Sequence, residues 1–186
     1  AYARQNNIPY LGLCYGLQLA VVEFARNVAG LDGANTTENE KQASYPVIDV
    51  LPSQKAVLEK HMYGGSMRLG AYAAKISRDT GIYRLYKETG RLKQDKMRLS
   101  QLDSFRIGKL SGQDIIIERH RHRYEVNPAY VKELSQGGLV FSGYHIRADN
   151  TQLMEFIELP KHRFFMATQA HPEFRSGLGR PHPLFF

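Results

Sequence analysis

The chain has 186 residues, of which 42% are hydrophobic and 23% are charged, so it can form one domain with a hydrophobic core. A single cysteine excludes an internal disulfide framework and fits a reducing, cytoplasmic compartment, and neither a signal peptide nor an apolar run of roughly 18–20 residues indicates a membrane. The net charge of +7 is spread along the chain, which argues against nucleic acid and fits a polyanionic small molecule or an acidic face of another domain equally well.

The first part of the chain begins with a predicted strand at residues 8–13, followed directly by a helix. Apolar residues recur at helical spacing after residue 16, at Leu17, Val21, Phe24, Val28 and Leu31. Gly30 and Gly33 are expected to end this helix, and the polar, turn-rich stretch 32–44 is expected to be a loop. A short strand is predicted at residues 46–51.

The rest of the chain alternates strands and helices, which predicts an α/β fold. Strands are predicted at residues 72–76, 115–117, 139–143, 153–159 and 164–168, with a helix at 128–136. Glu155 and Glu158 are the expected polar positions of one of these strands. The stretch 85–113 is rich in Lys, Arg and Gln, and we expect it to be a partly helical surface insertion.

The cysteine lies in a glycine-bracketed turn between the first predicted strand and the first predicted helix. Residues 12–16 read Gly-Leu-Cys-Tyr-Gly, the thiol version of the nucleophile elbow. The glycines permit a sharp turn, and the unpaired N–H groups of the first helical turn should favour the thiolate form of Cys14. A lone cysteine is most often a small buried hydrophobic residue, so assigning Cys14 as a nucleophile depends on this turn and on a partner base.

His171 is the candidate base, because it follows the strand predicted at residues 164–168 and precedes Pro172 and Glu173. Loops at one edge of a sheet converge, so His171 can reach a thiol at another strand end. Glu173 is close enough in sequence to bind the second imidazole nitrogen and orient the ring, which is the arrangement of a catalytic triad.

Arginine and histidine alternate over residues 119–123. If this segment is a strand, His120 and His122 lie on one face and the three arginines on the other. Two histidines at i and i+2 with no cysteine or third ligand nearby make a poor zinc set, and we predict no metal site.

These segments together resemble a class I glutamine amidotransferase domain, and more narrowly the C-terminal glutaminase domain of the CTP synthase family. The resemblance covers nearly the whole chain and is carried by residues 9–18, 23–28, 34–38, 64–70, 118–127, 171–174 and 180–185. It implies a class I amidotransferase-like sheet flanked by helices. It also implies that the first strands, a glycine-rich loop that completes the oxyanion hole and a synthetase domain precede residue 1, so that residues 1–186 are a partial amidotransferase domain.

The resemblance implies a role for each candidate residue. Cys14 would attack the side-chain amide of L-glutamine to form a γ-glutamyl thioester, while His171, oriented by Glu173, protonates the leaving ammonia and then activates water. The backbone N–H of Tyr15 would be one oxyanion donor. The implied substrate-binding positions are Tyr15, Gly16, Leu17, Gln18, Glu38 and Arg123.

Glu38 and Arg123 suit the two charged ends of free glutamine. A carboxylate at Glu38 matches the α-ammonium group, and a two-pronged guanidinium at Arg123 matches the α-carboxylate. Without the resemblance, a solvated loop acid and a surface arginine would be the simpler interpretations of these two residues.

The resemblance further implies the reaction of a longer protein. Ammonia from glutamine would aminate UTP to CTP with ATP and Mg²⁺, under activation by GTP, in a homotetramer. The present segment would hold no cofactor and, lacking the upstream donor, would be inactive or weak by itself. Two other functions stay open: a class I glutaminase serving another synthetase, and a non-catalytic regulatory module with the same fold.

Three positions raise questions of their own. Tyr15 stands where the family more usually has Leu, which is expected to change the pocket wall, and Ala170 replaces a more usual Phe, which is expected to loosen packing under the base. Arg68 is a candidate effector-binding residue, with a flexible surface arginine as the alternative.

Overall fold

The structure is a computed structural model that describes residues 1–50 and 67–186, so parts of the predicted segments 46–51 and 64–70 lie outside the described residues. The strands are β1 (Tyr10–Leu13), β2 (Ala34–Thr36), β3 (Tyr45–Asp49), β4 (Arg68–Ile76), β5 (Ile115–His122), β6 (Glu125–Val126), β7 (Val140–Ile146), β8 (Gln152–Glu158) and β9 (Phe165–Thr168). The helices are α1 (Tyr2–Gln5), α2 (Tyr15–Asn27), α4 (Gly81–Glu88), α5 (Arg91–Arg98), α6 (Ser104–Ile107) and α7 (Pro128–Gln136), with short 3-10 turns η2 (Leu99–Gln101), η3 (Pro172–Arg175) and η4 (Pro183–Phe185).

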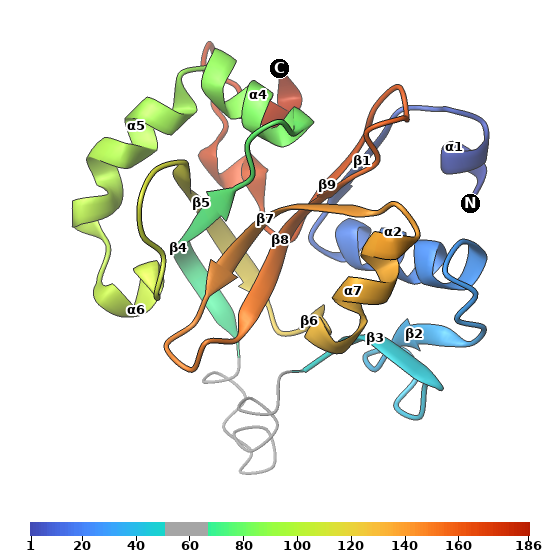
Figure 1. The fold of residues 1–186 in the computed structure, drawn as a ribbon. Coiled ribbons are helices and arrows are strands. Elements are labelled where there is room, and N and C mark those ends of the chain that lie inside the picture. The colour runs from blue at the N-terminus through green and yellow to red at the C-terminus, as the bar shows by residue number, and fades with distance from the viewer. Residues whose placement is uncertain (51–66) are drawn as a thin grey trace.

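A mixed sheet in the order β1-β9-β8-β7-β4-β5 forms the centre of the molecule, and a smaller sheet, β2-β3-β6, lies beside it (Figure 1). Strands β1 and β9 run parallel, whereas β9, β8, β7, β4 and β5 pair antiparallel to their neighbours. The register places Leu13 beside Thr168, so the carboxyl ends of β1 and β9 lie together. The predicted α/β class is confirmed.

Helices cover both faces of the central sheet. Leu17 of α2, Leu134 of α7 and Ile157 of β8 share one core cluster, and Tyr86 of α4 and Phe156 of β8 share another. Adjacent residues of β8 thus point to opposite faces, as strand geometry requires. None of the helices among the described residues is long and apolar enough to cross a membrane.

Several elements differ in extent from the sequence prediction. Helix α2 ends at Asn27, before the glycines, because the chain turns at Val28, whose N–H still bonds the Phe24 carbonyl at 2.9 Å. Strand β2 lies inside the predicted loop 32–44 and is formed by pairing with β3 rather than by its own pattern. Strands β4 and β5 are longer than predicted, since they pair with each other from Arg68 to Lys75.

Glu155 and Glu158 are both buried in β8, with exposed fractions of 1% and 3%. Glu158 accepts hydrogen bonds from the backbone N–H groups of Gly81 and Ile82 at 2.9 and 3.0 Å. A carboxylate at the N-terminus of α4 satisfies donors that have no partner within the helix.

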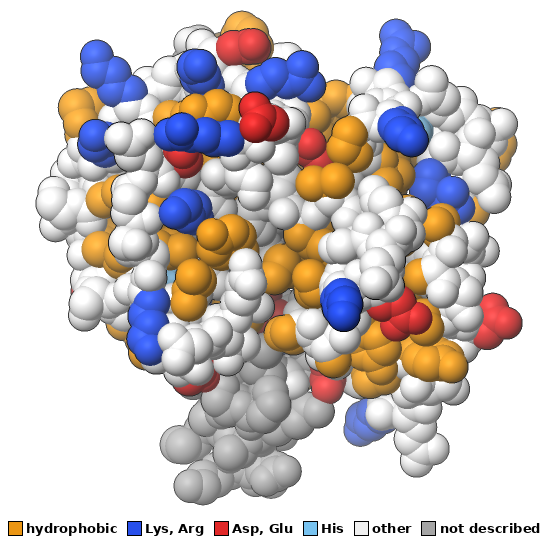
Figure 2. Space-filling model, in the orientation of Figure 1, with side chains coloured by type: hydrophobic (Ala, Val, Ile, Leu, Met, Phe, Trp, Pro, Cys, Tyr) orange, Lys and Arg blue, Asp and Glu red, His pale blue; other side chains and the backbone are white. Residues whose placement is uncertain are grey.

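The stretch 85–113 is helical over most of its length, through α4, α5, η2 and α6. Its side chains Tyr86 and Asp95 are fully buried, so the stretch packs against the sheet instead of lying only on the surface. Lys and Arg side chains gather over this part of the molecule, at the upper left of Figure 2. That it is an insertion stays a prediction.

Candidate active site

Cys14 occupies a strained turn between β1 and α2. Its backbone has φ 49° and ψ −101°, a conformation that non-glycine residues rarely adopt, and its N–H donates to the Thr168 carbonyl at 2.8 Å. Gly12 permits the close approach of the strand, because a Cβ there would lie 2.9 Å from Ala167 Cβ and from a backbone atom of Gly16. The nucleophile-elbow geometry therefore exists around Cys14.

The Cys14 thiol is partly buried and receives two polar contacts. The Gln169 amide donates toward the thiol with Nε2 3.7 Å from Sγ, and the Tyr15 backbone N–H also bonds the sulfur. Both contacts favour the thiolate, yet burial outweighs them and raises the pKa of Cys14. The expectation of a stabilised thiolate is wrong in this structure, because the turn that presents the thiol also removes it from water.

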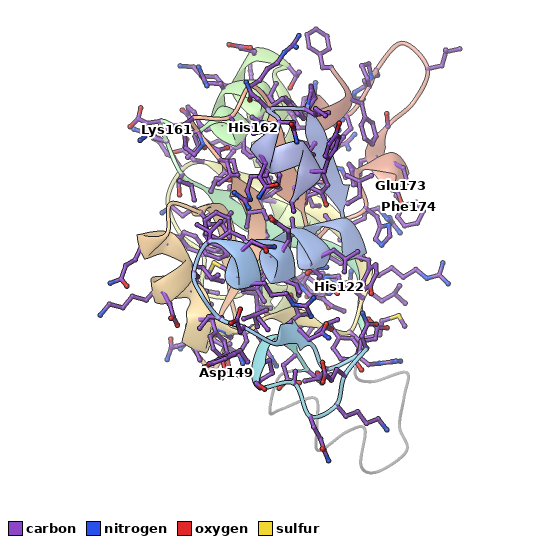
Figure 3. The ribbon with its side chains drawn as sticks, turned by 90° about the vertical axis from the view of Figure 1, so that its right-hand side faces the viewer. His122, Asp149, Lys161, His162, Glu173 and Phe174 are labelled. Carbon is purple, nitrogen blue, oxygen red and sulfur yellow. The ribbon has the colours of Figure 1, made fainter. Side chains whose placement is uncertain are left out.

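His171 and Glu173 form the expected pair. His171 Nδ1 lies 2.6 Å from Glu173 Oε1, and the His171 ring stacks on Phe174 with centroids 5.3 Å apart. The His171 backbone N–H donates to the Arg119 carbonyl at 2.8 Å, so β5 also positions the base. In Figure 3, Glu173 and Phe174 project together from η3 on the same side of the view as His122.

Ala170 lies in the segment between β9 and the base. It is buried, with an exposed fraction of 1%, and its N–H donates to the Thr168 hydroxyl at 3.1 Å. Phe174 packs on the ring of His171 from outside. That the smaller side chain loosens packing under the base stays a prediction.

The thiol and the base lie at neighbouring strand ends but are not in direct contact. Cys14 follows β1, and His171 follows β9 by three residues, on the two strands that pair in parallel. Within residues 1–50 and 67–186, no hydrogen bond joins the Cys14 thiol to the His171 imidazole. Catalytic hydrogen bonds are often longer before substrate binds.

A pocket of about 430 Å³ opens in front of Cys14, and we call it the Cys14 pocket. It brings together five of the candidate residues: Cys14, Tyr15, Gln18, Glu38 and Arg123. Among the described residues, Gly16, Leu17, His171 and Glu173 are not part of its lining, and the Leu17 side chain lies in the core. The volume is that of a small-molecule site.

Gln18 forms part of the back wall. Its Nε2 donates to the Tyr124 carbonyl at 3.1 Å and to Gln169 Oε1 at 3.3 Å. Gln169 in turn donates toward the Cys14 thiol. Helix α2, the residue after β9 and the turn between β5 and β6 are thus connected directly behind the sulfur.

Tyr15 connects the nucleophile turn to the loop that carries Glu38. The Asn39 amide donates to the Tyr15 hydroxyl at 2.7 Å, and the Glu38 N–H donates to Thr36 Oγ1 at 3.2 Å. A leucine at position 15 could not form the first of these bonds. The departure at this position therefore fixes one wall of the Cys14 pocket.

Sequence reasoning missed several residues at this site. Gln169 contacts the thiol, and Asn39, Met67, Arg121, His122 and Tyr124 line the Cys14 pocket. One signal for Gln169 was available in the sequence: it follows directly after β9, the strand that pairs with β1 and so ends beside Cys14. The others depend on contacts between distant segments.

Strand β5 alternates as predicted, with His120 and His122 buried and Arg119 and Arg121 exposed. The Tyr124 carbonyl can only accept, so the 3.0 Å contact assigns a proton to Nδ1 of His122. His122 Nε2 then accepts from His120 Nδ1 at 3.0 Å. Burial lowers the pKa of His122 to about 3, consistent with this neutral pair.

Arg68 is a buried ion-pair residue, not an effector-binding or flexible surface side chain. It is 6% exposed, with Nη1 2.5 Å from Glu155 Oε1 and 3.7 Å from Glu125 Oε1. Its guanidinium also lies over the Tyr72 ring, 4.6 Å from the centroid. Because burial removes both carboxylates from water and they share one arginine, the pKa of Glu125 is raised to about 8.

Metal chemistry has no candidate among the described residues, because no three His, Cys, Asp or Glu side chains within them could hold a metal ion together.

The chain is similar to known proteins over nearly its whole length. The family "Glutamine amidotransferase class-I" matches residues 1–186. The CTP synthases of Pyrococcus horikoshii and Methanocaldococcus jannaschii are each 48% identical to the chain over 184 residues. These matches cover 99% of this chain but only 29% and 28% of the relatives, so the chain spans less than a third of their length.

A solved structure is also similar. It is the glutaminase domain of Trypanosoma brucei CTP synthase with bound acivicin, which matches 98% of this chain and 59% of that chain with a TM-score of 0.76 and 33% sequence identity.

Proposed function

Because the chain belongs to the class-I glutamine amidotransferase family, we propose that its Cys14 pocket hydrolyses the side-chain amide of L-glutamine. One observation carries the proposal. One pocket contains the strained turn at Cys14, the carboxylate of Glu38 and the guanidinium of Arg123. The neighbouring strand end carries His171, whose ring is oriented by the carboxylate of Glu173. A regulatory module would not need this combination.

The proposed chemistry starts from a neutral thiol. Since the pKa of Cys14 is raised, His171 takes the thiol proton as Sγ attacks the amide carbon. The C–N bond breaks, His171 returns the proton to the leaving nitrogen, and ammonia departs from a γ-glutamyl thioester. Water, deprotonated by His171, then splits the thioester to glutamate and restores the thiol.

The other residues position the substrate and the developing charge. The Tyr15 N–H, which points at the sulfur, is one donor for the oxyanion. Glu38 holds the α-ammonium group and Arg123 the α-carboxylate, and the side chain of Gln18 shapes the site from its wall. Gly16 and Leu17 act through the backbone at the start of α2, directly after Cys14. Glu173 holds the imidazole and stabilises its cation.

We further propose that the ammonia aminates UTP to CTP with ATP and Mg²⁺, in a synthetase domain partnered with this one. The support is the similarity to CTP synthases at 48% identity. GTP activation and a homotetramer are part of the same proposal.

The first experiment measures ammonia release from glutamine by the purified protein and by Cys14→Ala. Exposed Glu133→Gln on α7 serves as the control, since it changes one charge away from the pocket. Loss of release in Cys14→Ala alone supports the nucleophile. Equal and measurable release by all three proteins would overturn it.

A second experiment tests the acceptor. CTP formation from UTP is measured in the protein joined to its proposed synthetase domain, first with glutamine and then with ammonium chloride. Cys14→Ala should lose only the glutamine-dependent reaction. A protein that releases ammonia but forms no CTP from either source would favour a different synthetase.

A further inference from the structure

A second cavity, of about 580 Å³, lies between α5, β5 and η3, and none of its lining residues belongs to the Cys14 pocket. We call it the arginine pocket, because five arginines line it: Arg91, Arg98, Arg119, Arg175 and Arg180. Among the described lining residues there is no Asp or Glu.

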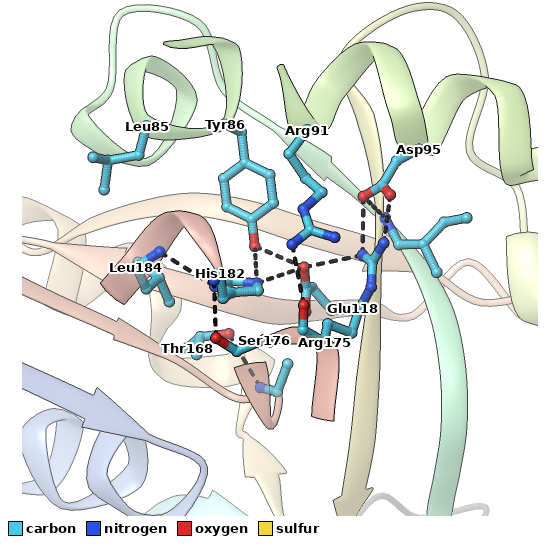
Figure 4. A network of polar contacts seen from close by, with 12 residues as sticks. Leu85, Tyr86, Arg91, Asp95, Glu118, Thr168, Arg175, Ser176, His182 and Leu184 are labelled. Carbon is cyan, nitrogen blue, oxygen red and sulfur yellow. Dashed lines mark hydrogen bonds and ion pairs between the residues drawn. The ribbon is translucent and has the colours of Figure 1, made fainter. Parts of the chain in front are cut away.

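Helix α5 is fastened to the sheet behind this cavity. Asp95 is fully buried, accepts the Ile117 N–H at 2.9 Å and binds both Nη atoms of Arg175, at 3.0 and 2.5 Å. Glu118 binds the same guanidinium at 3.3 Å and also accepts from Tyr86 (Figure 4). The backbone of α5, which carries Arg91 and Arg98, is therefore held in place before any ligand arrives.

The cavity carries positive charge that its described carboxylate neighbours do not neutralise. The carboxylates of Asp95 and Glu118 both contact Arg175, so five guanidinium groups against two carboxylates leave an excess of three positive charges. Arg91 is only 5% exposed, and its Nη2 donates to the Arg175 carbonyl at 3.1 Å. Burial and the charge of Arg175 lower the pKa of Arg91, as expected for an under-compensated cation.

We propose that the arginine pocket binds a di- or triphosphate group, either free or carried by a nucleotide. Guanidinium forks match phosphate oxygens with paired hydrogen bonds. A single carboxylate would leave most of the charge unmatched, whereas a terminal phosphate group brings roughly −1.5 to −2 charge and the inner phosphate groups of the chain add to it. Gln101 and Ser176 add polar groups to the wall, and Phe174 offers a ring face.

The pocket also adjoins the proposed base. The carbonyl of Arg119 accepts the His171 N–H, and Phe174 stacks on the His171 ring. Both residues line the arginine pocket. A ligand in the arginine pocket would thus contact residues that touch His171, without entering the Cys14 pocket.

Isothermal titration calorimetry of the purified protein tests the proposal, with inorganic triphosphate and ATP as separate probes. Arg98→Gln and Arg119→Gln each remove one exposed guanidinium from the pocket. Each should weaken binding by about 10-fold or more, the worth of a charge-assisted hydrogen bond. Exposed Arg84→Gln on α4, outside the lining, makes the same change of charge and should bind as the parent does.

Cys14→Ala should also bind the probes normally, which separates this site from the proposed glutaminase. If both probes bind with equal affinity, the pocket recognises the phosphate chain alone. If ATP binds more tightly, the pocket also contacts the base or the ribose. The proposal is overturned if neither probe binds, or if Arg84→Gln weakens binding as much as the pocket variants do.

Discussion

The side chains proposed to act around the Cys14 thiol divide into those that hold the base and those that hold the substrate. Glu173 belongs to the first group, because its only proposed task is to fix and stabilise the His171 ring through one 2.6 Å contact. Glu38 belongs to the second, because it lines the pocket from a loop outside the central sheet. Substitutions of the two residues should therefore change different kinetic parameters, kcat for Glu173 and KM for Glu38.

Glu173→Gln keeps the size of the side chain but removes the negative charge that stabilises the imidazolium. We expect kcat for glutamine hydrolysis to fall by about 10²–10⁴-fold with little change in KM. Steady-state kinetics measure this, with Glu133→Gln as the control of equal charge. A rise in KM with unchanged kcat would contradict the orienting role.

Glu38→Gln removes the proposed partner of the α-ammonium group. We expect KM for glutamine to rise by about 10-fold, with a smaller change in kcat, because this contact is made equally in the ground and transition states. Glu40→Gln is the matched control two residues away, outside the pocket lining. Equal KM values for both variants would remove Glu38 from the site.

At the scale of elements, the β1–α2 turn combines a close strand contact with a strained residue. The two glycines that bracket Cys14 are not equivalent. A Cβ at Gly12 would meet three atoms at 2.9 Å, whereas one at Gly16 has its nearest neighbour at 3.7 Å and lies in a helix with ordinary φ.

Gly12→Ala should therefore lower the free energy of unfolding by about 1–3 kcal/mol, the usual cost of overpacking. Gly16→Ala should change it little, since the helix gains propensity and nothing clashes. Denaturant unfolding of both variants provides the comparison. Equal loss in the two proteins would mean that the glycine requirement is not steric.

The elements that carry the site could be predicted because their signals are local. The glycine-bracketed cysteine, the helical spacing after it and the alternation of His120 and His122 all lie within a few residues. Strand β2 and the full lengths of β4 and β5 could not be predicted, because pairing with distant segments forms them.

At the scale of the whole molecule, buried ionisable groups couple stability to pH. Glu125 and Glu155 share Arg68 inside the sheet, with the buried rings of Tyr72, His120 and His122 around them. The pKa of Glu125 is raised to about 8, above its ordinary value of 4.5. Between about pH 4.5 and pH 8, the folded protein therefore holds a proton on Glu125 that the unfolded chain releases.

The sign of the effect follows from that difference. Stability from the protonated Glu125 is fully present below about pH 4.5 and is lost as the pH rises through about 8. Glu125→Gln mimics the protonated form, so its unfolding free energy should decline less than that of the parent over this range. Thermal or denaturant unfolding at a series of pH values measures the slope; identical slopes would show that Glu125 is ionised throughout.

The sequence by itself determined the nucleophile turn, the His171–Glu173 pair and the α/β class, since each rests on neighbouring residues or on spacing along one element. Only the tertiary structure decided that the Cys14 thiol is partly buried, that Gln169 contacts it and that Arg68 is buried between two carboxylates. It also decided that α5 closes an arginine-lined cavity beside the base. The physical reason is that burial and charge pairing depend on which distant strands and helices pack together, and no local pattern encodes that choice.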